Sequence, residues 1–129
     1  MGQSALSFLA VALGAAVGAW SRWGLSLWLN ARIESLPLGT LLANLGGGYL
    51  IGIAVGVFQD FPNLSPEWRL LVVTGFLGGL TTFSTFSAES MMLIQRGTYG
   101  WAFLHTGTHL LGSVACCIAG LATWRWLVG

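Results

Sequence analysis

Four long apolar runs, separated by short polar segments, limit how this chain can fold. Hydrophobic residues make up 55% of its 129 residues and charged residues only 7%, a balance typical of integral membrane proteins. A membrane-spanning helix needs about 20 mostly apolar residues. We therefore predict an all-α membrane protein, a single four-helix domain over residues 1–129, with spans at about 4–30, 38–59, 66–95 and 99–126.

The charged residues argue against several classes of function. The formal net charge is +1, and the arginines are not clustered, so we expect no nucleic-acid partner. The sequence shows no nucleophile–base constellation, nucleotide-binding glycine loop or zinc motif, so we do not expect an enzyme.

A polar stretch inside the third span, residues 75–87, is the main candidate for function. Non-helical backbone at membrane depth survives only where protein buries it or water solvates it. We expect the glycines at 75, 78 and 79 to break the third helix there. A break exposes carbonyl groups, which are ligands suited to cations.

Aromatic side chains follow the expected break. Phe83 and Phe86 are three residues apart and share one helix face, and Glu89 follows three residues further along it. The edges of aromatic rings are positive and can contact an anion. Two core phenylalanines would be the simpler interpretation, but the threonines and serines around them favour a polar path.

Polar residues also interrupt the second and fourth spans. Asn44 lies inside the second span, where an unpaired amide is costly, so we expect it either to join helices or to line a pore. His105, His109 and Ser113 recur every fourth residue and share a face, which indicates a polar surface. Two histidines at this spacing can also bind a metal, but no third ligand is evident nearby in the sequence.

Arg22 lies inside the first span among tryptophans, where an arginine must snorkel, pair or face water. It is either an anchor at the membrane interface or a cation at the mouth of a pore. Small residues four apart, Gly14 with Gly18 and the series 48, 52 and 56, predict close helix packing.

The remaining arginines divide evenly between the two sides of the membrane. Arg32 and Arg96 would lie on one side, and Arg69 and Arg125 on the other. Orientation follows the bias of such charges, so a chain without bias can insert both ways. Two opposed copies would form an antiparallel homodimer with an isologous interface, surrounded by membrane lipid.

Three motifs resemble the Fluc (CrcB) family of fluoride channels. They are Gly75-Phe-x-Gly-Gly-x-Thr-Thr-Phe-Ser-Thr-Phe86, Gly39-Thr-Leu-x-x-Asn44-x-x-Gly-Gly and Gly14-Ala-x-x-Gly-Ala-x-x-Arg22-Trp. The resemblance covers all four spans. It implies a dual-topology, antiparallel homodimer in the bacterial inner membrane that lets fluoride leave the cell passively, with a structural sodium ion at the dimer axis.

The resemblance also assigns roles to individual residues. Phe83 and Phe86 would line the fluoride pathways with their ring edges, beside the amide of Asn44. Other pathway residues would be Ser84, Ser87, Thr40, His105, His109 and Ser113. Sodium would be held by the carbonyls of Gly78 and Thr81, with Gly75 as a further candidate, and the vestibules would contain Arg22 and Glu89. The family pattern has tyrosine or serine where this chain has the two histidines, which can add sensitivity to pH near neutral.

Two other classes of function remain open from the residues. A small dual-topology, proton-coupled drug exporter has the same size and weak charge bias, and it needs a deep carboxylate. Glu89 is the only candidate at membrane depth, and it falls near a helix end. A membrane assembly subunit that transports nothing would also explain the glycine faces.

Overall fold

The computed structural model describes residues 2–129, with side chains from Ser4 onward. Its elements are α1 (Gly2–Leu29), α2 (Leu38–Asp60), α3 (Pro66–Arg69), the π-helix η1 (Leu70–Leu77), α4 (Gly78–Leu80), α5 (Phe83–Gln95) and α6 (Tyr99–Val128). Four segments are long and apolar enough to cross a membrane: Ser4–Leu29, Leu38–Asp60, Pro66–Gln95 and Tyr99–Val128. The predicted all-α membrane fold with a broken third helix is confirmed.

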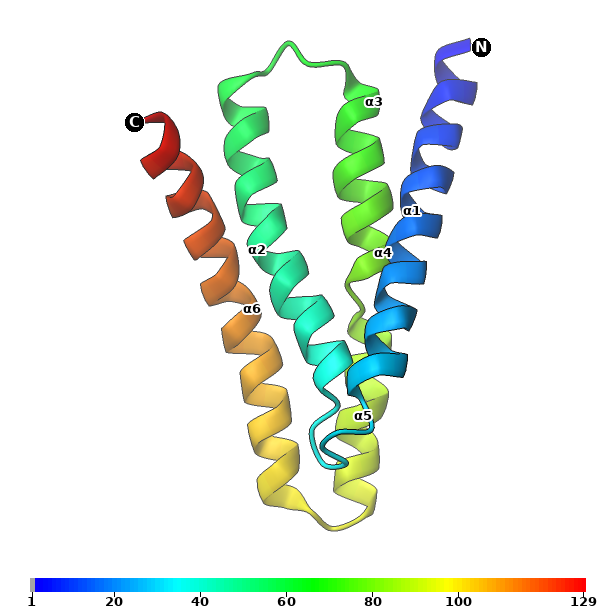
Figure 1. The fold of residues 1–129 in the computed structure, drawn as a ribbon, viewed down its shortest axis with the longest axis vertical. Coiled ribbons are helices and arrows are strands. Elements are labelled where there is room, and N and C mark those ends of the chain that lie inside the picture. The colour runs from blue at the N-terminus through cyan, green and yellow to red at the C-terminus, as the bar shows by residue number, and fades with distance from the viewer. Residues whose placement is uncertain (1) are drawn as a thin grey trace.

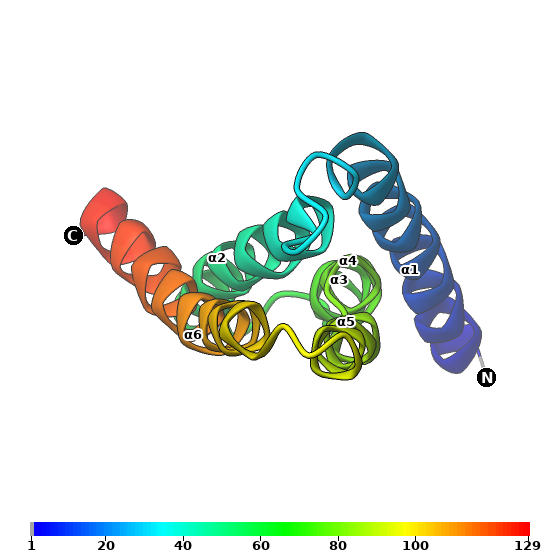
Figure 2. The same ribbon diagram turned by 90° about the horizontal axis from the view of Figure 1, so that it is seen from below.

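The helices form two packed pairs. α6 lies along α2, and α1 lies along η1 and α4. The pairs meet around α5 and spread apart toward the end that carries both termini (Figure 1). From below, α1 and α6 are outermost (Figure 2). Between them lie α2 and the third segment, Pro66–Gln95, which consists of α3, η1, α4 and α5.

The position predicted for the break is wrong. Gly75, Gly78 and Gly79 all lie in helix, and the backbone first becomes extended at Thr81 (ψ 157°) and Thr82 (φ −151°). Thr82 is the N-cap of α5, because its side chain accepts a hydrogen bond from the backbone of Thr85 at 3.1 Å. A threonine cap, rather than glycine flexibility, therefore defines where the helix starts again.

Two glycines of the third segment instead allow α1 to approach closely. A Cβ atom at Gly75 would lie 3.0 Å from the Cα of Gly14, and one at Gly79 would lie 2.6 Å from the carbonyl oxygen of Ala15. The small-residue face predicted on the first span is thus matched by a second small-residue face on the third.

The glycine face predicted on the second span is confirmed as a packing surface. A Cβ atom at Gly48 would lie 2.9 Å from the carbonyl oxygen of Ser113, and one at Gly52 would overlap the carbonyl of Cys117. Gly120 of α6 packs in the same way against α2, because a Cβ there would overlap the carbonyl of Tyr49. α2 and α6 therefore meet backbone to backbone.

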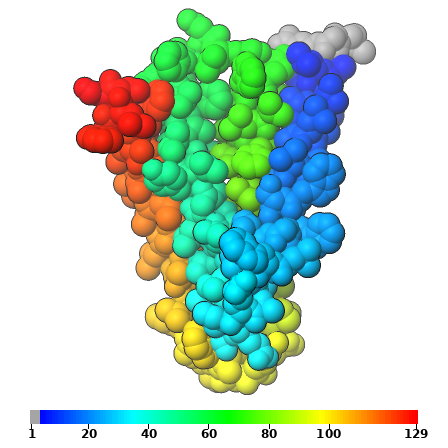
Figure 3. All heavy atoms as spheres, viewed as in Figure 1, coloured from blue at the N-terminus to red at the C-terminus, as the bar shows by residue number. Residues whose placement is uncertain are grey.

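The outer surface is strongly apolar. Phe8, Phe103 and Trp126 are each at least 79% exposed, and α1, α2 and α6 all contribute to the face in Figure 3. Water is a poor solvent for such a surface, so it needs lipid or another protein chain against it.

Candidate functional site

Asn44 of α2 is bonded directly to the helix break. Its side-chain oxygen accepts from the backbone N–H of Thr82 at 2.7 Å, and its amide nitrogen donates to the Thr82 carbonyl at 3.0 Å. One amide therefore satisfies both backbone groups of a residue that no longer belongs to a helix. This contact joins α2 to the third segment, as expected of a residue that links helices.

The carbonyls of Gly78 and Thr81 are among those that the break leaves without their helical donors. In a continuous helix, the N–H of Thr82 would bond the carbonyl of Gly78, and that of Thr85 would bond the carbonyl of Thr81. These donors instead go to Asn44 and to the Thr82 hydroxyl. The Gly75 carbonyl differs, because it accepts from the backbone N–H of Gly78.

Aromatic rings and histidines stack beside the break. The Phe86 ring lies 5.4 Å from that of Phe83, 5.5 Å from that of His105 and 4.9 Å from that of His109, measured between centroids. His109 is buried, and its Nδ1 lies 3.0 Å from the amide nitrogen of Asn44. Phe83, by contrast, is 78% exposed.

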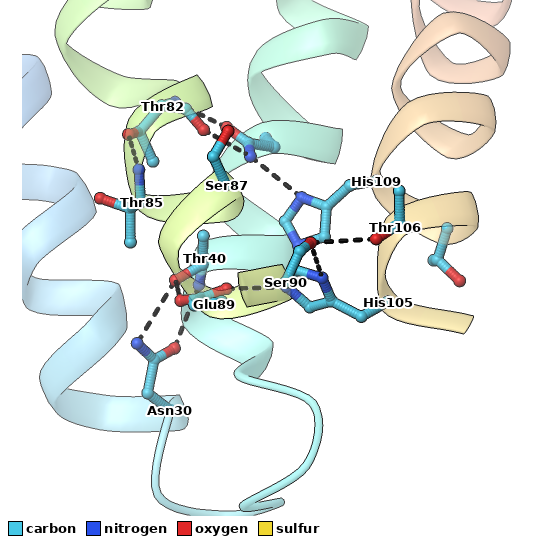
Figure 4. Close-up of polar contacts among 12 residues, drawn as sticks. Asn30, Thr40, Thr82, Thr85, Ser87, Glu89, Ser90, His105, Thr106 and His109 are labelled. Carbon is cyan, nitrogen blue, oxygen red and sulfur yellow. Dashed lines mark hydrogen bonds and ion pairs between the residues drawn. The ribbon is translucent and has the colours of Figure 1, made fainter. Parts of the chain in front are cut away.

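A second polar cluster lies further along α5, beyond the break (Figure 4). Thr40 donates its hydroxyl to Glu89 Oε2 at 2.7 Å, and His105 Nε2 lies 2.9 Å from Glu89 Oε1. All three side chains are buried. Because they come from α2, α5 and α6, the cluster ties three helices together.

Two residues that the sequence interpretation missed extend this cluster. Asn30, just after α1, accepts from the backbone N–H of Thr40 at 3.1 Å. The Ser90 hydroxyl lies 2.9 Å from His105 Nδ1 and 3.0 Å from the hydroxyl of Thr106 (Figure 4). In the sequence, Asn30 stands only at the end of the first predicted span, and Ser90 only beside Glu89.

A mainly apolar cavity of about 480 Å³ borders the break. The proposed site residues that line it are Asn44, Gly78, Thr81, Phe83, Phe86, His109 and Ser113. Ser84 and Ser87 lie on exposed surface, where Ser84 approaches the Thr82 hydroxyl at 3.3 Å and Ser87 donates to the Phe83 carbonyl at 2.8 Å. The site thus consists of a cavity wall and a buried cluster behind it.

The fold brings a third potential ligand beside the two histidines, although none lies near them in the sequence. Glu89, His105 and His109 each offer a ligand atom, and these atoms lie within 4.8 Å of one another. Glu89 is 16 positions before His105 and lies on another helix, so sequence proximity could not find it. It is buried, with only 7% of its surface exposed.

These features define a class of protein: a small four-helix membrane protein with polar groups buried beside a broken span, as in proteins that move ions or solutes. The family model described as CrcB-like protein, Camphor Resistance (CrcB), matches residues 9–121. The chain therefore belongs to the CrcB family.

Curated relatives match nearly the whole chain. A protein of Cupriavidus pinatubonensis (strain JMP 134 / LMG 1197) is 62% identical over 122 residues, covering 95% of this chain and 97% of the relative. A protein of Pseudomonas putida (strain W619) is 58% identical over 123 residues, with the same coverage. Both are named "Fluoride-specific ion channel FluC". With its four apolar helices and bacterial relatives, the chain is an integral protein of the bacterial plasma membrane.

Proposed function

We propose that this chain is a fluoride channel that lets fluoride leave the bacterial cell passively. One structural observation carries the proposal: hydrogen-bonding side chains from α2, α5 and α6 gather beside a helix break within otherwise apolar spans. Polar groups are expensive at membrane depth and mark pathways there. The names of its relatives supply the identity of the ion.

The residue types suit a small, strongly hydrated anion. Such an ion enters a membrane only if protein groups replace its water, and it leaves only if they bind it weakly. Phe83 and Phe86 would present ring edges, whose partial positive charge attracts an anion without trapping it. The hydroxyls of Ser84 and Ser87 and a ring N–H of His109 would add neutral donors.

A structural sodium ion is part of the proposal. Carbonyl oxygens are ligands for hard cations, and those of Gly78 and Thr81 have lost their helical donors to Asn44 and Thr82. These two groups therefore suit the ion, whereas the Gly75 carbonyl already accepts a backbone hydrogen bond. Sodium would be coordinated by the two carbonyl oxygens and would hold the break in place.

The functional unit in this proposal is an antiparallel homodimer. Arg32 and Arg96 lie near the end with the α1–α2 and α5–α6 connections, and Arg69 and Arg125 near the opposite end. This even division supports insertion in both orientations. A second copy would cover Phe83 and double the two carbonyls, giving four oxygen ligands around one axis.

Ion efflux from liposomes that contain only the purified chain tests the function. We expect release of fluoride with retention of chloride. Equal leakage of both ions, or release of neither, would contradict a fluoride channel. Release of neither ion is what a non-transporting assembly subunit predicts.

The burial of Glu89 gives a proton-coupled exporter some support, because exporters of this size use a buried carboxylate. The contact with His105 at 2.9 Å could carry a proton. Glu89→Gln distinguishes the two functions, since it would abolish all transport by an exporter. A channel needs no carboxylate to couple protons, so we expect Glu89→Gln to retain fluoride efflux that is independent of a proton gradient.

A further inference from the structure

His109 has a buried polar atom that nothing in the described chain satisfies. Only 3% of its surface is exposed, and its Nε2 has no hydrogen-bond partner among residues 2–129. An unsatisfied buried polar group costs free energy, so a group of this kind needs a ligand or water to offset it. His109 also lines the cavity beside Phe83 and Phe86.

Asn44 determines which ring nitrogen of His109 carries the proton. The backbone N–H of Thr82 can only donate, so the Asn44 atom 2.7 Å from it must be the oxygen Oδ1. The amide nitrogen then has two hydrogens and two neighbours at 3.0 Å, the Thr82 carbonyl and His109 Nδ1. Nδ1 must therefore accept, and the neutral imidazole carries its hydrogen on Nε2.

We propose that the Nε2–H of His109, and not the amide of Asn44, is the hydrogen-bond donor to the anion at this level of the pathway. Both amide hydrogens of Asn44 are already used, so Asn44 is a positioning residue that acts through His109. The helix break fixes this arrangement. The Thr82 backbone orients the Asn44 amide, and the amide in turn places the His109 proton on Nε2. This inference rests on the proposed fluoride function.

The same geometry argues against a metal at Glu89, His105 and His109. A histidine nitrogen binds a metal only when it carries no proton. While Asn44 donates to Nδ1, the free Nε2 of His109 keeps its hydrogen and repels a cation. A donor with no acceptor suits an anion instead, and fluoride is the smallest halide acceptor.

The first test compares His109→Gln with His109→Asn in liposomes that contain the full chain. A glutamine can place its amide nitrogen near the Nε2 position, whereas the shorter asparagine reaches only the Nδ1 position. We expect fluoride efflux through the asparagine variant to be about tenfold slower than through the glutamine variant, as for loss of one hydrogen bond to an ion. Equal rates would overturn the assignment.

Nitrogen NMR of histidine-labelled protein in lipid gives a readout that does not depend on flux. We expect the wild-type protein to show a protonated Nε2 and a bare Nδ1 at His109, with the Nε2–H signal moving when sodium fluoride is added. Asn44→Asp replaces the donor with an acceptor, so the proton should move to Nδ1. A wild-type proton on Nδ1 would overturn the proposal even if the variant failed to fold.

The two tests separate this inference from the proposed function. If wild-type liposomes release no fluoride, the channel function fails, whatever the histidine proton does. If they release fluoride but the Nε2–H signal does not shift when fluoride is added, only the proposed role of His109 is contradicted. A signal that moves with zinc chloride instead would indicate a metal site and would also overturn the inference.

Discussion

Arg22 Nε donates a hydrogen bond to the carbonyl oxygen of Gly79 across 3.1 Å, joining α1 to α4. In a continuous helix, that carbonyl would accept from the N–H of Phe83, which here begins α5. The arginine thus supplies a donor that the break removed. The sequence interpretations, an interfacial anchor or a cation at a pore mouth, did not include this contact with the break.

Replacing Arg22 tests that contact. Arg22→Met removes the donor to Gly79, and we expect the free energy of unfolding in detergent to fall by about 1–3 kcal/mol. Arg32→Met is the control, since Arg32 Nε also donates to a carbonyl, that of Trp28, but on exposed surface. We expect a change of less than about 0.5 kcal/mol there. Similar losses in both variants would refute the special role of Arg22.

Thr82→Val removes the N-cap of α5 while retaining the shape of the side chain. The Thr85 N–H then loses its acceptor, and we expect the unfolding free energy to fall by about 0.5–2 kcal/mol. Thr82→Ser keeps the hydroxyl and should lose much less. Thr108→Val is a second control, because that hydroxyl only donates to a carbonyl within α6. Thermal unfolding in detergent measures all three.

Gly120→Ala tests the contact between α2 and α6. The new methyl would overlap the carbonyl of Tyr49 and lie 3.1 Å from the backbone nitrogen of Ile53. We expect a loss of about 1–3 kcal/mol from overpacking. Gly107→Ala on the same helix meets nothing within 4 Å, so it should be neutral or gain about 0.5–1 kcal/mol. A stable Gly120→Ala protein would show that the helices can separate.

Thr40→Val tests the buried cluster around Glu89. The carboxyl loses its donor at 2.7 Å, and we expect the free energy of unfolding to fall by about 1–3 kcal/mol. Thr40→Ser keeps the hydroxyl and should preserve most of the stability. Fluoride efflux measured on the same samples will show whether this cluster serves only the fold. An unchanged Thr40→Val protein would contradict the contact.

Phe83→Ile tests the aromatic role in conduction. An aliphatic side chain lacks the positive ring edge, so we expect fluoride efflux from liposomes to stop while cross-linking still detects the dimer. Phe103→Ile is the matched control, because Phe103 is 84% exposed on α6 and is not part of the cavity wall. Undiminished flux through the Phe83 variant would refute the role of the ring.

Hydropathy predicted the spans because crossing a membrane imposes a length and an apolar composition on each helix. The break was harder to place, because glycine is found both where helices bend and where they pack closely. Only the position of α1 shows that Gly75 and Gly79 serve packing. The cap signal at Thr82, a threonine just before a helix that starts at Phe83, was present in the sequence and is the better guide.

The candidate site was predicted in part for a similar reason. The types of polar residue in spans two, three and four marked a pathway, but their partners depend on tertiary contacts. Thr40 and Glu89 are 49 positions apart, and Asn44 and His109 are 65 apart. No local pattern in a single sequence connects such pairs, so the tautomer of His109 could not be predicted.

Because the two helix pairs spread apart, the chain should be stiffer where they meet than where they diverge. Hydrogen bonds that join the pairs gather near Thr82 and Glu89, whereas the pairs diverge toward the termini. Local opening begins where few bonds must break. Amide hydrogens of the diverging ends should therefore exchange with solvent before those at the closed end, near Thr82 and Glu89. We therefore expect the closed end to act as a hinge, about which α1 and α6 can move apart.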